Sequence, residues 1–104
     1  MKLIKKLSSM IEDEIEGARC YAKMALEYKD SDPEMARIMY QHSLAEMQHM
    51  TDLHEIVVSK IDEYRRSKGE PPAAMLAVYE YVHDRHIDEA AEVKAMQNLY
   101  ANRS

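Results

Sequence analysis

Residues that break helices stand at only two places in this chain, and this placement constrains the fold more than any other feature of the sequence. All three prolines and one of the two glycines lie in the segments 29–34 and 67–72. The stretches between them are dominated by Ala, Leu, Met, Glu, Lys, Arg and Gln, which favour helix. A chain of 104 residues has room for one domain. We therefore predict a single all-α domain built from a few long helices.

The same two segments predict where the helices begin and end. Asp32 is a suitable N-cap for a helix that starts at Pro33, and Gly69 is a suitable C-terminal stop. The first helix has two candidate starts, because apolar residues are in phase from residue 3 while Ser9 and Glu12 match a capping box. With the earlier start, the predicted helices cover about residues 3–29, 33–67 and 72–101. Short connections make consecutive helices antiparallel neighbours.

Charge and composition exclude several classes of function. A net charge of −5 argues against a phosphate-binding surface, because nucleic-acid affinity comes mainly from clustered Lys and Arg. No apolar run approaches the roughly 18 residues of a membrane span, and no signal-peptide core follows the basic N-terminus. The single cysteine, Cys20, cannot form an internal disulfide, which is typical of a reducing compartment. We expect a cytoplasmic protein that binds neither nucleic acid nor membrane.

Carboxylates interrupt the apolar faces of the first two predicted helices. On a helical wheel, Glu14 lies at the centre of the first apolar stripe, and Glu46 lies within the second beside His42 and His49. A buried carboxylate without a partner is costly, so each needs protonation, a cationic partner or a metal ion. The stripes are Leu3, Leu7, Met10, Ile11, Ala18, Tyr21, Ala25 and Tyr28 in the first helix, and Met35, Met39, Met50, Leu53, Val57 and Tyr64 in the second.

The positions of the two glutamates along the chain place them at the same level of the helix pair. Glu14 is 17 residues before Ser31 in the connecting turn, and Glu46 is 15 residues after it. Each is therefore about 25 Å from the turn at 1.5 Å per residue. His49 follows Glu46 by three residues, so both side chains project from one face. These three residues can meet at one ligand centre.

The segments Glu14-Ile-Glu-Gly-Ala-Arg-Cys-Tyr21 and Glu46-Met-Gln-His49 resemble the first half of a rubrerythrin or ferritin-like di-iron protein. The resemblance covers about residues 10–62. It implies that Glu14 bridges or chelates iron, that Glu46 bridges two irons, and that His49 is a terminal nitrogen ligand. It also implies that Tyr21 lies near the metal as a donor in its redox chemistry.

The chain departs from that family because the second half of the pattern, in helices three and four, is missing. Glu80 and His83 form a formal Glu-x-x-His, but Glu80 points away from the apolar face of the third predicted helix. In its short length and single half-site it is similar to encapsulated ferritins, in which two subunits each contribute half of the ligands. A homodimer would supply four carboxylates and two imidazoles to two iron ions, with manganese or zinc as alternatives. The implied function is a ferroxidase or another iron-handling oxidoreductase that uses oxygen or peroxide.

The third predicted helix carries further candidate ligands. His83, His86 and Glu89 follow one another at steps of three residues, near an apolar face that includes Tyr79 and Val93. Level counting from the second turn places residues near 89–92 opposite Glu46, which favours Glu89, and we add His86 to the candidates. A polar layer at a subunit interface explains these residues equally well.

A metal-free interpretation remains open for the whole set. Glu14 can pair with a buried Arg, Lys or His, and Glu46 with His49 can form a hydrogen-bonded pair in the core. The chain would then be an oligomeric helical interaction or assembly module, in which polar residues fix the register of the helices.

Overall fold

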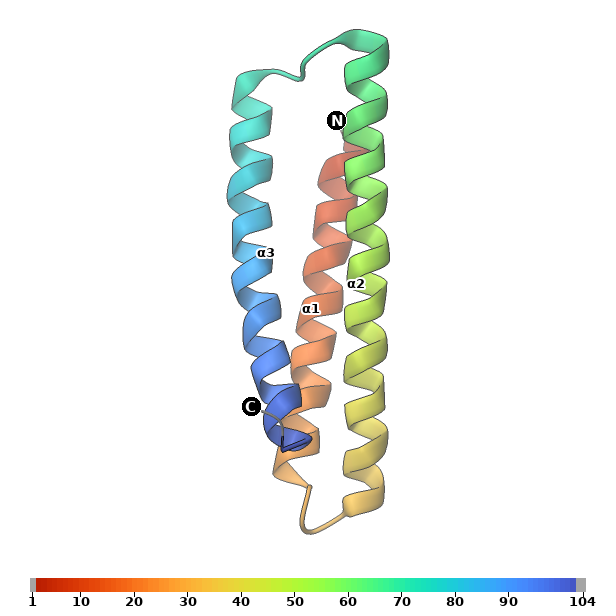
Figure 1. Cartoon of the computed structure of the whole chain (residues 1–104), viewed down its shortest axis with the longest axis vertical. Coiled ribbons are helices and arrows are strands. Elements are labelled where there is room, and N and C mark those ends of the chain that lie inside the picture. Colours follow the sequence, from red (N-terminus) through yellow and green to blue (C-terminus); the bar gives the residue numbers. More distant parts are fainter. Residues whose placement is uncertain (1, 103–104) are drawn as a thin grey trace.

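The computed structural model describes residues 2–102 and consists of three long helices, with no strand in that part of the chain (Figure 1). They are α1 (Lys2–Glu27), α2 (Pro33–Lys68) and α3 (Ala73–Tyr100). The predicted all-α class is confirmed, and each end of the three helices lies within two residues of its expected position. The molecule measures 55 × 20 × 18 Å, so its length is that of α2. None of the described helices is long and apolar enough to cross a membrane.

The turns between the helices use the residues that break helix in the sequence. The carboxylate of Asp32 accepts a hydrogen bond from the backbone N–H of Met35 at 3.2 Å, and Pro33 opens α2. At the other end of α2, Gly69 adopts a φ of 83°, a left-handed conformation that glycine adopts without strain. Its N–H donates to the carbonyl of Arg65 at 3.1 Å. Since α1 begins at Lys2, Ser9 lies within the helix and is not its cap.

The core is a seam along α1 packed against α2. Its buried side chains on α1 recur at steps of three and four residues, which keeps them on one face of the helix. Alanines in the second half of that face let the helices approach closely. The buried apolar residues are Ile4, Leu7, Ile11, Ile15, Ala18, Ala22 and Ala25 on α1, Ala36, Val57 and Ile61 on α2, and Val93 on α3.

The apolar stripe expected on the first helix is rotated from the face that the structure buries. Leu3 and Met10 are 49% and 42% exposed, whereas Ile4 and Ile15, which the stripe leaves out, are buried. The expected stripe was too wide, because it combined the core seam with a neighbouring apolar face. Glu14 consequently lies beside the seam and not at its centre.

The third helix is anchored to the other two mainly through its second half. Its buried residues are His86, at the midpoint of the helix, and Val93 and Gln97 beyond it. The amide of Gln97 donates to the Ser43 hydroxyl at 2.8 Å, and that hydroxyl donates to the carbonyl of Ala18 at 2.8 Å. This buried chain of hydrogen bonds joins all three helices. Figure 1 shows α3 close to α1 near the C-terminal end and standing apart from both helices near the turn that follows α2.

Candidate metal centre

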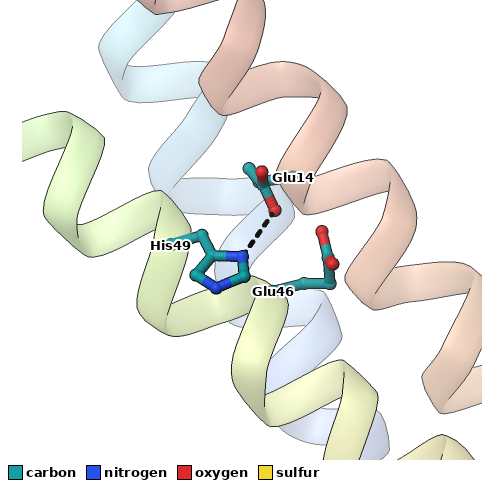
Figure 2. Close-up of side chains that lie close together, drawn as sticks. All are labelled: Glu14, Glu46 and His49. Atoms are coloured by element: carbon teal, nitrogen blue, oxygen red, sulfur yellow. Dashed lines mark ion pairs between the residues drawn. The ribbon is translucent and has the colours of Figure 1, made fainter.

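Glu14, Glu46 and His49 meet midway along α1 and α2, each with a ligand atom within 4.8 Å of the others (Figure 2). The Nδ1 atom of His49 is 3.4 Å from Oε2 of Glu14. Glu14 comes from α1, while Glu46 and His49 are one helical turn apart on α2. The antiparallel turn at residues 28–32 sets this register, which brings the two glutamates to one level.

Gly17 leaves space for the Glu46 carboxylate. It lies one turn after Glu14 on α1, and a Cβ atom added there would be 3.2 Å from Oε2 of Glu46. That distance is tighter than ordinary van der Waals contact, so a larger residue would displace the carboxylate. Sequence reasoning overlooked Gly17, although an isolated glycine within a helical segment costs about 1 kcal/mol relative to alanine and so invites a local explanation.

One oxygen of the cluster is both buried and without a hydrogen-bond partner. This atom is Oε2 of Glu14, whose side chain is 25% exposed as a whole. The neighbouring His49 ring lies within ion-pair distance of it and is 55% exposed. A buried carboxylate oxygen that lacks a donor is rare in folded proteins and marks a position where a cation would be favourable.

The crowding of two carboxylates raises the pKa of Glu46. The largest cause is hydrogen bonding between its protonated form and Glu14, followed by burial and then by the negative charge of Glu14. The nearby His49 acts in the opposite direction. The cluster therefore carries more negative charge than its surroundings neutralise, and a proton or a metal ion would relieve the repulsion.

The cluster lies on the side of the α1 and α2 pair that faces away from α3. Glu12 and Arg19 face α3, where they contact His86 and Glu92. Glu14 is two residues after Glu12, about 200° around the helix, and so points to the opposite side. Figure 2 shows α3 behind the two helices that carry the cluster. The three ligand candidates are therefore accessible to another chain without any movement of α3.

Tyr21 lies two turns along α1 from Glu14, on the same face of the helix. Its ring stacks on His42 of α2, with ring centroids 5.1 Å apart and planes inclined by 29°. His42 is exposed and precedes Glu46 by about one turn. Tyr21 and His42 thus form the next layer of side chains beyond the cluster.

The structure does not bring His86 or Glu89 to the same cluster. His86 is buried, and its Nε2 atom lies 2.7 Å from Oε2 of Glu12. Glu89 pairs with Arg85 at 3.4 Å and with Arg19 at 3.9 Å. The level predicted for α3 relative to α2 is close to the observed one, since Gln97 bonds to Ser43 and His83 stacks on His54. The packing of α3 on the other flank of α1 separates these residues from Glu46.

A second group of carboxylates, from Glu12, Glu16 and Glu89, has oxygens within 4.8 Å of one another. Two arginines neutralise it: Arg19 pairs with Glu16 and Glu89, and Arg85 pairs with Glu12 and Glu89. This arrangement is a network of ion pairs between α1 and α3, and it needs no metal ion to balance its charge.

No protein-family model, curated protein or solved structure matches this chain. Its function is therefore inferred from the chemistry and geometry of the cluster itself.

Proposed function

We propose that the chain binds metal at a site shared by two copies, each of which contributes Glu14, Glu46 and His49. The observation that carries the proposal is the buried Oε2 atom of Glu14, which has no hydrogen-bond partner and lies beside a second carboxylate and an imidazole. All three side chains open onto the face away from α3. A second copy brought to this face would double the ligand set.

The chemistry of the ligands favours iron. Two copies would supply four carboxylates and two imidazoles, a set rich in oxygen that suits ferrous iron or manganese, with zinc as a weaker alternative. A pair of divalent ions would offset the repulsion that raises the pKa of Glu46. It would also provide the partner that Oε2 of Glu14 lacks.

Apolar residues around the cluster support a dimer through the same surface, which we call the outer face. On α1, Leu3 and Met10 precede Glu14 by 11 and 4 residues, spacings that keep them on its side of the helix. On α2, Ile38 and Ile56 lie 11 residues before and 7 after His49. The four apolar side chains are 37–49% exposed in the single chain. Burying them against a second copy would form a four-helix core around the ligands.

The residues of the site have distinct roles in this proposal. Glu14 and Glu46 would hold both ions through carboxylate oxygens, and the His49 of each copy would bind one ion through a ring nitrogen. Glu46 binds metal as the carboxylate, so metal binding competes with its protonation. Iron bound there would supply one-electron redox chemistry toward oxygen or peroxide, with ferrous iron as the substrate of a ferroxidase. Tyr21, two turns away, would be a proton or electron donor at the edge of the site.

Metal content tests this proposal. The chain is loaded anaerobically with ferrous iron, freed of excess metal and measured for iron per chain, beside Glu46→Ala and the control Glu55→Ala. Glu55 is an exposed carboxylate on the same helix and outside the cluster. About one iron per chain in the wild type and in Glu55→Ala, with loss in Glu46→Ala, supports the shared site. Absence of iron from all three proteins would favour the metal-free interaction module.

A further inference from the structure

Three of the five histidines line a cavity that lies among all three helices, on the flank of α1 that faces α3. The cavity has a volume of about 320 Å³. His54 enters it from α2, and His83 and His86 enter it from α3, together with Thr51 and apolar side chains of α1 and α2. The cluster of Glu14, Glu46 and His49 does not use these residues. The three histidines and Thr51 are the polar residues of its lining.

The histidines are held by specific neighbours. The rings of His54 and His83 stack with centroids 4.7 Å apart and planes inclined by only 10°. Tyr79 also stacks on His83, at 5.8 Å. His86 is 5% exposed, and its Nε2 atom lies 2.7 Å from the Glu12 carboxylate. One nitrogen of His86 is therefore committed to Glu12, which leaves Nδ1 as the atom available to a ligand.

We propose that this cavity binds one divalent transition-metal ion that prefers nitrogen ligands, such as zinc, through His54, His83 and His86. His83 and His86 are three residues apart, a spacing that lets two side chains of one helix share an ion. His54 supplies the third nitrogen from the neighbouring helix. The ligand atoms of the three histidines do not all lie within 4.8 Å of one another, so the stacked rings of His54 and His83 would rotate toward the ion, and the volume of the cavity gives them room to do so.

Glu12 is a positioning residue for this site. A carboxylate that accepts the other N–H of a metal-bound histidine fixes the tautomer and the orientation of the ring. The contact between Glu12 and His86 has this form before any ion is bound. The donors are all nitrogen, so the cavity would select zinc, cobalt, nickel or copper over the oxygen-preferring ions that suit Glu14 and Glu46.

The test uses the full chain with Glu46→Ala, which disables the carboxylate site and so separates this inference from the proposed function. Zinc is added to the metal-free protein and counted by equilibrium dialysis. Cobalt then reports the coordination number through its visible absorption, and spectra of the histidine ring nitrogens identify the ligands. The expected result is one ion per chain, a four-coordinate cobalt spectrum and shifts at His54, His83 and His86.

Single substitutions in that background assign the ligands. His54→Ala and His83→Gln should abolish zinc binding, and Glu12→Gln should weaken it by roughly 10–100-fold. His42→Ala removes an exposed histidine on the outer flank of α2 and should leave binding unchanged. Circular dichroism of each variant establishes that it is folded. The inference is overturned if folded Glu46→Ala binds no zinc, if His54→Ala binds it unchanged, or if only His42 and His49 shift.

Discussion

Gly17 lowers the stability of α1, but it makes room for the Glu46 carboxylate in the cluster formed by Glu14, Glu46 and His49. A glycine within a helix costs about 1 kcal/mol relative to alanine, because it loses more backbone freedom on folding. Because Gly17 has no Cβ, Oε2 of Glu46 can lie only 3.2 Å from the position that a Cβ would occupy. The two effects have opposite consequences for a substitution at this position.

Gly17→Ala should stabilise the metal-free protein and weaken its binding of iron. The free energy of unfolding should rise by about 0.5–1 kcal/mol, since the flexible end of Glu46 can move aside. The same movement displaces a ligand oxygen, so the increase in melting temperature on adding ferrous iron should shrink. Ser9→Ala, at an exposed position of α1, is the control and should keep the full iron effect. Unchanged iron affinity in Gly17→Ala would show that Gly17 makes no room for the ligand.

Protonation of Glu46 should link pH to both stability and metal binding. The pKa of Glu46 in the folded chain is raised above the ordinary value of 4.5, first by hydrogen bonding to Glu14 and then by burial. The raised pKa stabilises the folded chain. This stabilisation is fully present when the pH is below the pKa of Glu46 in the unfolded chain, and it is lost as the pH rises through the pKa of Glu46 in the folded chain. Iron affinity should increase over the same pH range, because the metal needs the carboxylate.

Glu46→Gln isolates this effect, because glutamine resembles the protonated acid. The variant should be more stable than the metal-free wild type at neutral pH, and the difference should disappear below pH 4.5. Urea unfolding of both proteins at a series of pH values measures the difference directly. A difference that stays constant across the series would mean that Glu46 titrates normally in the folded chain.

At the scale of the helices, one buried chain of hydrogen bonds ties α3 to both α1 and α2. Gln97 donates to Ser43, and Ser43 donates to the carbonyl of Ala18, so each helix contributes one group. Both side chains are buried, Ser43 completely. Removing one partner leaves a buried donor or acceptor without a bond, which costs more than the net value of the bond itself.

Ser43→Ala should therefore destabilise the chain by about 1–3 kcal/mol, because it leaves the buried Gln97 amide without its acceptor. Ser59→Ala, at an exposed position of the same helix, is the control and should change stability by less than about 0.5 kcal/mol. Thermal and urea unfolding measure both variants. Equal stability of the two variants would indicate that water reaches the Gln97 amide and that α3 is not held by this contact.

Much of the helical arrangement could be read from the sequence, because it depends on local chemistry. Asp32, Pro33 and Gly69 act through their own backbone and side-chain bonds, so the ends of α2 follow from their order in the chain. The shared level of Glu14 and Glu46 follows from a short turn and a fixed rise per residue. The residues that meet there were therefore predictable, although their role as metal ligands is still a prediction.

The remaining features depend on how the helices pack in three dimensions. A helical wheel cannot show which flank of α1 receives α3, so His86 and Glu89 were expected beside Glu46 and instead face Glu12 and Arg19. A helical wheel also cannot show which part of a wide apolar stripe is buried in the core and which part stays exposed. Leu3 is therefore expected in the core but is exposed. The space that Gly17 provides depends on a side chain from another helix.

At the scale of the whole molecule, the proposed site and the outer face make one prediction about assembly. Met10 lies four residues before Glu14 and is 42% exposed in the single chain. Met10→Glu should prevent dimerisation by placing a charge in an apolar interface, and iron binding should fall with it. Val78→Glu is the matched control, since Val78 is an apolar residue of α3 that is 64% exposed and far from the outer face. Sedimentation and iron content should separate the two variants. Dimer loss in Val78→Glu alone would place the interface on α3.

The most direct test of the shared site measures mass and metal in the same sample. The wild-type chain is sedimented without metal and after anaerobic loading with ferrous iron, and the iron in the sedimenting species is counted. Because each ion would bind only where two copies meet, iron should shift the equilibrium toward the dimer, with about one iron per chain. A monomer that binds iron in full, or a dimer that forms to the same extent and holds no iron, would contradict the account.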